Sequence, residues 1–520
     1  METRFENSIA KWIKWGFCLI FAAVFIIVVF VDKKVAGAVN STLHPAAPNI
    51  LLVLFPAAMA AALWLMWRKC TFVHKFCGFC NRRFLILLWG MALVLLAVQW
   101  FISYHIYFFA GWDPSIVVGY AYYIAAGEQT IGDFWYYSQH VHQIPVTAVL
   151  GWIQELPCFL GYNAWAYFVC ILVDCVLINL AGVFAALSLR KLTGSGSAAL
   201  LAFTLFSVLV GISPWMVVPY SDTYSILFPS LVFYLYLKAR EAKSKKRELL
   251  LWFLIGLLGR FGMMIKASCG MVLIAILCVE AVKLIGEKKQ VKLSILQHLG
   301  MVAVTLLIMV GVQKIMVWYT GCILNEDIRL TYTHYLMMGF NEETVGTYNS
   351  NDYLFSGLQP TVAERQAANF QMIRERLKNY GVGGYLYFLV RKTLTNYNDG
   401  TFSWWMEGGF NMKDSSKYQT LLTQRLRRLF YGGTDWNLYF STFEHALWLG
   451  VLGMLLGIFL MKTGKMRSQE NVMLLSLLGS FAYVSLFEAR GRYLYCMLPI
   501  YVMCAIYGLW LCFKKFSGKP

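Results

Sequence analysis

The sequence WDPSIVVGYAYYIAAGEQTIGDFWYYSQHVHQ (residues 112–143) directly follows a long apolar segment that ends near Phe109. It contains two aspartates, one glutamate, two histidines and many aromatic rings. A connection that only links two helices is usually shorter and carries fewer titratable groups. Such groups beside a membrane-spanning segment mark a candidate functional site. We therefore expect Asp113 to be the chemical centre of the protein.

The apolar segments on either side of this stretch define the class of protein. The chain has 520 residues, of which 59% are hydrophobic and 14% are charged, and its mean hydropathy is +0.58. A soluble globular chain is about half apolar and about one quarter charged. The first apolar run, residues 12–31, is long enough to span a bilayer and lacks a small-residue cleavage site, so we expect no cleavable signal peptide. The sequence predicts an all-α polytopic membrane protein.

Apolar runs of membrane-spanning length predict about twelve transmembrane helices. We place them at residues 12–31, 50–67, 84–108, 163–189, 198–213, 223–237, 249–264, 269–285, 295–319, 439–461, 471–487 and 493–513. We expect 144–160, which is shorter and more mixed, to be a helix at the membrane interface. The expected organisation is two helices and a basic loop (1–83), a transmembrane core (84–319) with the outer loop 109–162, an extracytoplasmic segment (320–438), and C-terminal transmembrane helices (439–520).

The distribution of charge orients this arrangement. The formal net charge is +18, which by itself would be compatible with nucleic-acid binding. However, the surplus lies near the N-terminus and in short stretches at 68–83, 190–191, 238–248, 286–292, 462–470 and 514–519. This is the positive-inside pattern, and it places these stretches and both termini in the cytoplasm. The sequence therefore predicts membrane lipids as partners and no nucleic acid.

Cysteine usage indicates no disulfide framework, because the thirteen cysteines are spread mostly through apolar segments. One cluster, CTFVHKFCGFC, brings Cys70, His74, Cys77 and Cys80 close in sequence. Its spacing is compatible with a small zinc site. The alternative, which we favour, is a reduced basic loop.

The opposite, outer face collects seven charged residues that lie at the ends of predicted spans. These residues are Asp113, Asp133, Asp222, Lys266, Glu488, Arg490 and Arg492. For any one of them, helix capping or snorkelling is the simpler interpretation. Asp222, for example, is expected to cap the span that begins at Thr223, and Asp133 fits a Gly-Asp turn. Their gathering on one face favours a functional site.

The outer segment 320–438 has its own helical signals. Thr361 and Glu364 form a capping-box pattern before a helix that we expect to end at Gly381. The apolar and basic stretch 383–397 is typical of a helix on the membrane surface. The following loop, 398–410, is rich in glycine and tryptophan and is expected to lie over a bound ligand.

An aspartate under a water-facing loop is suited to general-base catalysis, in which it removes a proton from an attacking hydroxyl group. A phosphate leaving group needs no strong acid, but it does need positive charge on its oxygens. Lys266, Arg490 and Arg492 are placed to supply that charge. His140 and His142 could act as bases, bind a metal ion or simply lie at the interface.

Several motifs of this chain are similar to those of one known superfamily. They are Asp113 at the start of the first large outer loop, the pair His142-Gln143, PYSDTYSILFP (219–229), MMIKAS (263–268), YNDGTFSWWMEGGF (397–410) and FEARGRYLYCMLP (487–499). In their order they resemble the GT-C superfamily of polytopic glycosyltransferases, in particular bacterial members that act on envelope polymers. The resemblance covers most of the chain after about residue 84. One departure is His140-Val141, where relatives often have Tyr-Pro.

The resemblance implies an inverting transfer of sugar from a polyprenyl-phosphate donor to a glycan, lipid or protein acceptor on the extracytoplasmic face. It implies Asp113 as catalytic base, with Asp133 as the candidate second acidic residue, and it implies that Lys266, Arg490 and Arg492 bind the donor phosphate. We also expect His142 to be catalytic, and Gln143, Asp222, Asp399 and Glu488 to bind substrate. It points to a bacterial plasma membrane. No cofactor is expected, although a divalent metal ion stays possible.

Two other functions remain open from the sequence. A transporter or lipid flippase would explain the many spans and the charges, but it would be expected to show repeats and a mid-membrane site. No repeat is visible in this sequence. A polymerase or ligase of lipid-linked glycans would share the expected fold and differ only in the acceptor.

Overall fold

The computed structural model describes residues 4–32, 43–128, 134–286, 289–408, 420–462 and 467–516, and within these ranges all regular elements are helices. The first half contains α1 (Arg4–Phe30), α2 (Asn49–Leu52), α3 (Leu54–Lys69), α4 (Thr71–Arg82), α5 (Phe84–Ile106), α6 (Trp112–Ala125), α7 (Phe134–Gln139), α8 (Ile144–Phe159), α9 (Ala166–Thr193), α10 (Gly196–Phe206), α11 (Ser221–Tyr224) and α12 (Leu227–Ala239). The second half contains α13 (Lys245–Ile265), α14 (Met271–Gly286), α15 (Lys289–Thr320), α16 (Tyr332–Gly339), α17 (Ser350–Gly357), α18 (Val362–Tyr397), α19 (Trp404–Glu407), α20 (Leu421–Phe430), α21 (Asp435–Leu455), α22 (Ser468–Leu486) and α23 (Leu498–Phe516). The predicted all-α fold is confirmed.

Nine helices in the described part of the chain are long and apolar enough to cross a membrane. They are Glu6–Phe30, Asn49–Lys69, Phe84–Ile106, Asn163–Thr193, Lys245–Ile265, Ala267–Ile285, Val291–Thr320, Asp435–Leu460 and Gly491–Phe516. The other three expected spans are also helical but shorter or more polar, namely Gly196–Gly211, α12 and α22. The membrane class is therefore supported by composition and length, while the number twelve stays a prediction.

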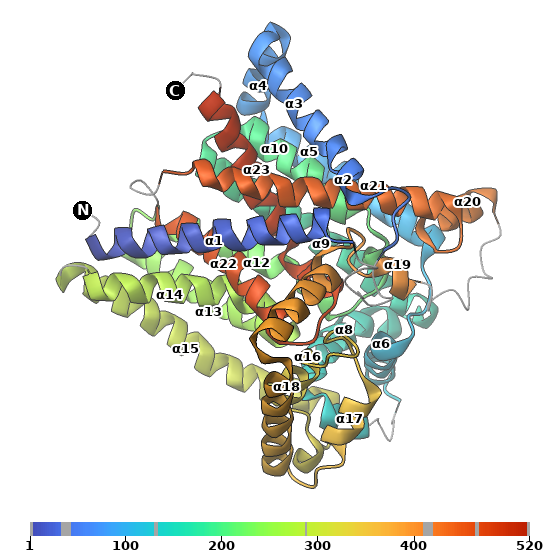
Figure 1. Cartoon of the computed structure of the whole chain (residues 1–520). Helices are drawn as coiled ribbons and strands as arrows, with labels where there is room; N and C mark the ends of the chain where they lie inside the picture. Colours follow the sequence, from blue (N-terminus) through green and yellow to red (C-terminus); the bar gives the residue numbers. More distant parts are fainter. Residues whose placement is uncertain are drawn as a thin grey trace.

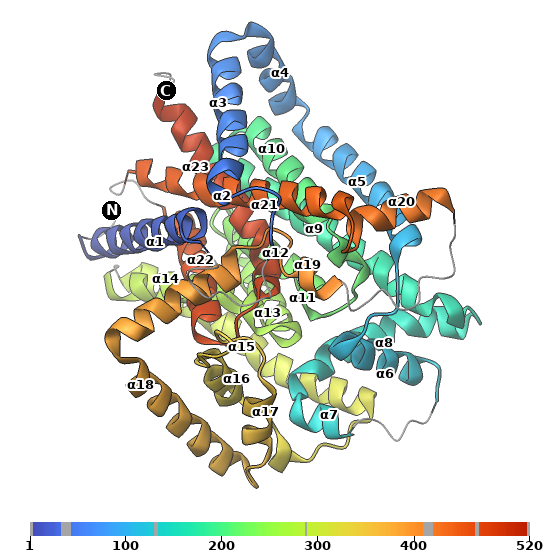
Figure 2. The same cartoon turned by 45° about the vertical axis from the view of Figure 1, so that its right-hand side comes forward.

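The long helices run across the molecule with both chain termini toward one end (Figure 1). The short helices α6, α8, α16 and α17 gather at the other end. Figure 2 shows α6, α7 and α8 to one side of that end and α16, α17 and α18 to the other. The stretches that the sequence assigned to the outer face therefore lie together, far from the termini.

Helix α8 forms in the segment 144–160, which we expect to lie at or dip into the membrane interface. It is buried along most of its length, including Val146, Leu150 and Gln154, and it packs against α6, α9 and α15. The proline at its second position is compatible with a helix start, since the missing N–H would be unpaired there anyway. Helix α8 thus packs against α6 and holds the helix whose first turn carries Asp113.

The outer segment confirms the predicted capping box. The Glu364 N–H donates to Thr361 Oγ1 at 3.3 Å, and the Thr361 N–H donates to Glu364 Oε2 at 3.2 Å. The helix breaks at Gly381, where φ is 56°, a value that L side chains rarely adopt. A second helical stretch then continues to Tyr397, as predicted for residues 383–397.

A buried lysine joins this second stretch to the last outer loop. Lys392 is 1% exposed, and its Nζ donates to the carbonyl oxygens of Gly339 at 2.5 Å and Phe487 at 2.7 Å. Gly339 lies so close to that loop that a Cβ atom on it would clash with the backbone oxygen of Leu486. Lys392 and Gly339 therefore hold Phe487, and with it Glu488, against the outer segment.

Replacing Lys392 with methionine is expected to destabilise the protein by about 2–5 kcal/mol, because two buried carbonyls lose their donor. Burial lowers the pKa of Lys392 to about 7, with Glu488 opposing the shift. Between this pKa and the usual value near 10.5 the unfolded chain binds more protons, so folding stability rises with pH by about 1.4 kcal/mol per unit. The wild type should gain this increment between pH 7 and 9.5, and the Lys392→Met variant should not.

Thermal unfolding in detergent across that pH range measures the difference. Lys378→Met is the matched control, since Lys378 lies on the same helix and is exposed. Equal pH profiles for the wild type and Lys392→Met would show that Lys392 does not titrate in the folded protein.

Candidate functional site

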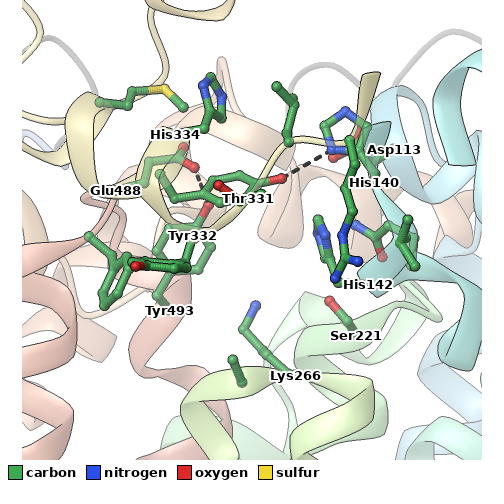
Figure 3. Close-up of a pocket in the computed structure, with 18 of the residues that line it drawn as sticks. Asp113, His140, His142, Ser221, Lys266, Thr331, Tyr332, His334, Glu488 and Tyr493 are labelled. Carbon is green, nitrogen blue, oxygen red and sulfur yellow. Dashed lines mark hydrogen bonds between the residues drawn. The ribbon is translucent and has the colours of Figure 1, made fainter. Parts of the chain in front are cut away.

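A cavity of about 1110 Å³ opens at the end of the molecule where the outer segments meet. One part of its wall comes from the start of α6, the segment 136–143 and the N-terminal end of α11. The rest comes from the turn between α13 and α14, the segment 326–338 and the loop 487–493. Figure 3 shows Asp113, His140 and His142 on one side of this space and Glu488 and Tyr493 on the other, with Lys266 extending between them. The cavity is slightly larger than most small-molecule sites, which span about 300–1,000 Å³.

Asp113 lies in the first turn of α6, where the positive end of the helix dipole favours a carboxylate. The residue before it, Trp112, has φ of 47°, an unusual conformation for a bulky residue. Such backbone strain is often retained at functional sites because the surrounding packing holds it in place. Asp113 thus begins a helix, and it is not a residue left at the end of the preceding span.

A chain of hydrogen bonds positions Asp113. Gln143 Nε2 donates to the Tyr220 hydroxyl oxygen, and that hydroxyl donates to Asp113 Oδ2 at 3.5 Å. Because Gln143 occupies the oxygen of Tyr220 as a donor, the tyrosine proton is left to point toward the carboxylate. Burial, reinforced by the nearby charge of Asp113, raises the pKa of Tyr220 well above its usual value, so this proton is retained. No ion pair joins Asp113 to a cation anywhere in the described ranges.

Three histidines line the same cavity as neutral rings. Burial lowers the pKa of His142 to about 3 and that of His334 to about 4. Burial also lowers the pKa of His140, although the neighbouring Asp113 charge opposes this shift. His140 Nδ1 lies 3.1 Å from the Tyr335 hydroxyl. Near neutral pH these rings can therefore accept or donate a hydrogen bond without adding positive charge.

Two arginines of the last outer loop share one carboxylate. Arg490 Nη1 lies 3.1 Å from Glu407 Oε1, and Arg492 Nη1 lies 3.0 Å from Glu407 Oε2. The Arg492 guanidinium also stacks 4.5 Å from the centroid of the Trp112 ring. The buried Nε atoms of both arginines lack a hydrogen-bond partner among the residues that the structure describes. Each guanidinium has five N–H donors, so Glu407 orients these side chains while leaving donors for an anionic ligand.

Lys266 supplies a third cation from the turn between two predicted spans. It forms an ion pair with Asp222, and its Nζ lies 4.8 Å from the centroid of the Tyr493 ring. Tyr493 in turn donates to Glu488 Oε2 at 2.8 Å. The carboxylates of Asp222 and Glu488 thus hold the cations and aromatic rings of this wall in place.

The structure brings together most of the residues that the sequence singled out. Eight of them line the cavity: Asp113, His140, His142, Gln143, Lys266, Glu488, Arg490 and Arg492. Asp222 is not among the lining residues, but it forms an ion pair with Lys266. The prediction that Asp222 caps the span beginning at Thr223 is wrong. Asp222 lies inside the short helix α11, which begins at Ser221 with Tyr220 as its cap, and the longer helix α12 begins only at Leu227. Asp133 lies outside the described residues.

Asp399 is not among the cavity-lining residues. Its carboxylate accepts hydrogen bonds from the backbone N–H groups of Thr401 at 2.8 Å and Ser403 at 2.9 Å. Phe402 and Ser403 both have positive φ angles, of 54° and 71°, and the Asp399 bonds stabilise this tight turn. The same turn leads into α19, which carries Glu407. Asp399 therefore stabilises the turn that precedes Glu407.

The sequence did not suggest a role for several cavity-lining residues, including Trp112, Tyr220, Arg329 and Tyr335, or for Glu407, which pairs with two lining arginines. Tyr220 and Glu407 lie inside motifs that were noted, but their neighbours in sequence do not reveal their contacts. Each binds a residue more than 80 positions away. The sequence signal for Glu407 is its position as the single charged residue in the mainly apolar stretch 402–408.

The described residues contain no group of three or more histidine, cysteine, aspartate or glutamate side chains placed to share a metal ion. This applies to His140 and His142 and to the possible zinc ligands Cys70, His74, Cys77 and Cys80. The last three of these lie on the single helix α4, and His74 packs against the ring of Trp67.

The fold and this cavity define a polytopic membrane protein with a charged site at one end of its helix bundle. Within that class, the chain belongs to the family described as conserved hypothetical integral membrane protein, whose sequence model matches residues 5–510. No curated protein matches the sequence.

Among solved structures, the chain is similar to the archaeal oligosaccharyltransferase AglB from Archaeoglobus fulgidus, determined in complex with an inhibitory peptide and a dolichol-phosphate. The similarity has a TM-score of 0.41 at 11% sequence identity, over 82% of this chain and 50% of AglB. The chain thus spans about half the length of that protein.

Proposed function

We propose that this protein is a membrane glycosyltransferase that moves a sugar from a polyprenyl-phosphate donor to a glycan, lipid or protein acceptor. The observation that carries the proposal is the meeting of Asp113 with Lys266, Arg490 and Arg492 around one cavity. The GT-C-like motifs of the sequence support the same reading. We further propose that the cavity faces the extracytoplasmic side, as the distribution of basic loops predicts. The resemblance to GT-C glycosyltransferases implies that this membrane is a bacterial plasma membrane.

In the proposed reaction, an acceptor hydroxyl attacks the anomeric carbon and inverts its configuration. Asp113 takes the hydroxyl proton as the new glycosidic bond forms, and Tyr220 holds the carboxylate in position. The bond from the anomeric carbon to the phosphate oxygen breaks, and the polyprenyl phosphate leaves with its electron pair. Arg490, Arg492 and Lys266 stabilise the growing negative charge on its oxygens.

The unpartnered polar atoms of the cavity support a ligand of this kind. Besides the two arginine Nε atoms, the buried atoms Trp112 Nε1, Tyr136 Oη and Gln143 Oε1 have no hydrogen-bond partner in the described part of the chain. Buried polar groups are normally satisfied, so such atoms around one space favour a polar ligand. A phosphate would pair with the arginine donors, and sugar hydroxyls could pair with the others.

The position of these charges favours a transferase over a transporter or flippase. Asp113 begins α6, Lys266 lies between α13 and α14, and Arg490 precedes the last helical segment. All three are at helix ends, whereas a transporter of the inverted-repeat type places its site near the bilayer midplane.

The test is transfer by the purified protein in liposomes, supplied with a polyprenyl-phosphate hexose labelled in the sugar. Reactions contain a glycan, a glycolipid or a peptide acceptor, or none, each with and without added Mg²⁺. The expected result is labelled acceptor together with released polyprenyl phosphate. Transbilayer movement of the intact donor without release of polyprenyl phosphate would replace this proposal with a flippase function. No donor consumption with any acceptor, despite donor binding, would also overturn it.

A further inference from the structure

The ten-residue helix α20, LLTQRLRRLF (421–430), has a basic face and an apolar face. It carries Arg425, Arg427 and Arg428 and no acidic residue. Arg425 and Arg428 are exposed, and so are the leucines at its start, with 63% of Leu421 and 43% of Leu422 accessible. Exposed leucines beside exposed arginines are unfavourable in water but are typical of helices that lie in a lipid headgroup layer.

Contacts of α20 place it beside the ends of two helices that are long and apolar enough to span a membrane. Thr423 Oγ1 lies 2.9 Å from His105 Nδ1, in the last turn of α5, and the Tyr431 hydroxyl donates to the Ile106 carbonyl. At its other side, Asn437 Nδ2, in the first turn of α21, donates to the Leu429 carbonyl at 3.0 Å. Both α5 and the helix that begins at Asp435 are long and apolar enough to span a membrane. Figure 1 shows α20 at the end of the bundle opposite the chain termini.

We propose that α20 docks on the anionic lipid headgroups of the leaflet that surrounds the cavity. Arg425 and Arg428 bind the headgroup phosphates, while Leu421 and Leu422 enter the edge of the acyl region. The partner is a lipid surface because the helix offers positive charge and apolar area together, where the spans leave the membrane.

This docking is connected to the candidate site through α19. Trp404 Nε1 donates to the carbonyl oxygen of Phe430, the last residue of α20, at 2.7 Å. Three residues later, on the same short helix, Glu407 binds Arg490 and Arg492. A shift of α20 relative to the spans would therefore move the carboxylate that orients both arginines. This part of the inference, a lipid-dependent donor affinity, rests on the proposed function.

The experiment uses the full chain in nanodiscs made of phosphatidylcholine alone or with 30–50% phosphatidylglycerol. The first measurement is hydrogen–deuterium exchange of the peptide covering residues 421–430. In the wild type we expect anionic lipid to slow exchange by about fivefold or more, because each arginine near an anionic surface contributes to binding. The second measurement is the affinity for polyprenyl phosphate, which should rise with the fraction of phosphatidylglycerol.

Two double variants of α20 and one control on α18 test whether the effect depends on the charge of Arg425 and Arg428. Arg425→Gln/Arg428→Gln should lose the lipid dependence of both measurements, and Arg425→Lys/Arg428→Lys should keep it. Arg374→Gln/Lys378→Gln, which neutralises two exposed cations of α18, should behave as the wild type.

Exchange of 421–430 that is independent of lipid charge would overturn the docking proposal. Lipid-dependent exchange combined with a constant affinity for polyprenyl phosphate would overturn the connection through α19 and leave the docking intact. Neither outcome depends on sugar transfer, so failure of the proposed glycosyltransferase activity would be seen separately.

Discussion

Replacing Asp113 with asparagine is expected to lower the rate of sugar transfer by about 10²–10⁴-fold, the range typical of removing a general base. Asparagine has nearly the same shape and keeps an oxygen that can accept the Tyr220 hydrogen bond. It cannot take the proton of the attacking hydroxyl. The measurement is the initial rate of labelled product formation at saturating donor, with the amount of folded protein checked by size-exclusion chromatography.

Glu375→Gln is the matched control, because it neutralises an exposed carboxylate on α18 that is not among the residues lining the cavity. Binding of polyprenyl phosphate to the Asp113→Asn variant should stay close to that of the wild type. A wild-type transfer rate in this variant would remove Asp113 from the mechanism. A loss of donor binding as large as the loss of rate would instead give Asp113 a binding role.

The second large effect is expected at the arginine pair. Arg492→Gln should weaken binding of the polyprenyl-phosphate donor by about ten- to a hundredfold, because a hydrogen bond to a charged group contributes about 1.5–3 kcal/mol. The same substitution also removes one of the two partners of Glu407. Donor titration by fluorescence or calorimetry, with the rate at saturating donor measured in parallel, separates binding from chemistry.

Glu407→Gln provides a double-mutant cycle with Arg492→Gln. If Glu407 only orients the arginine, its substitution should weaken donor binding in the wild-type background and have a much smaller effect once Arg492 is absent. Arg374→Gln controls for the general loss of an exposed cation. Donor affinity that is unchanged in Arg492→Gln would exclude Arg492 from phosphate binding.

Much of the fold could be predicted from local sequence. Apolar runs located the membrane-spanning helices, and the Thr361–Glu364 pattern located the start of α18, because both signals act over a few residues. The prediction for Asp222 was wrong because its neighbours could not show that the helix begins at Ser221 and that Lys266 lies beside it. The helix at 144–159 was predicted, but its burial beneath α6 depends on distant segments.

The candidate site was predictable as a set of residue types on one face. Its contacts were not, since Asp113 meets Tyr220 and Glu407 meets Arg492 across 107 and 85 positions of sequence. These pairs form only when separate helices pack, and the packing angle decides which atoms meet. The role of Asp399 shows the same limit: a residue in a noted motif supports the turn before α19, and it is not among the residues that line the cavity.

By itself, the sequence determined that this is an all-helical membrane protein, and it determined which charged groups the chain can bring to one end. Hydrophobic segments and the placement of basic residues are local features of the chain, so residue order is enough to specify them. Only the tertiary structure decided which carboxylates bind the cations and that Asp113 forms no ion pair in the described ranges. Those pairings depend on distances of a few ångströms between helices that are far apart in the chain, and such distances arise from packing alone.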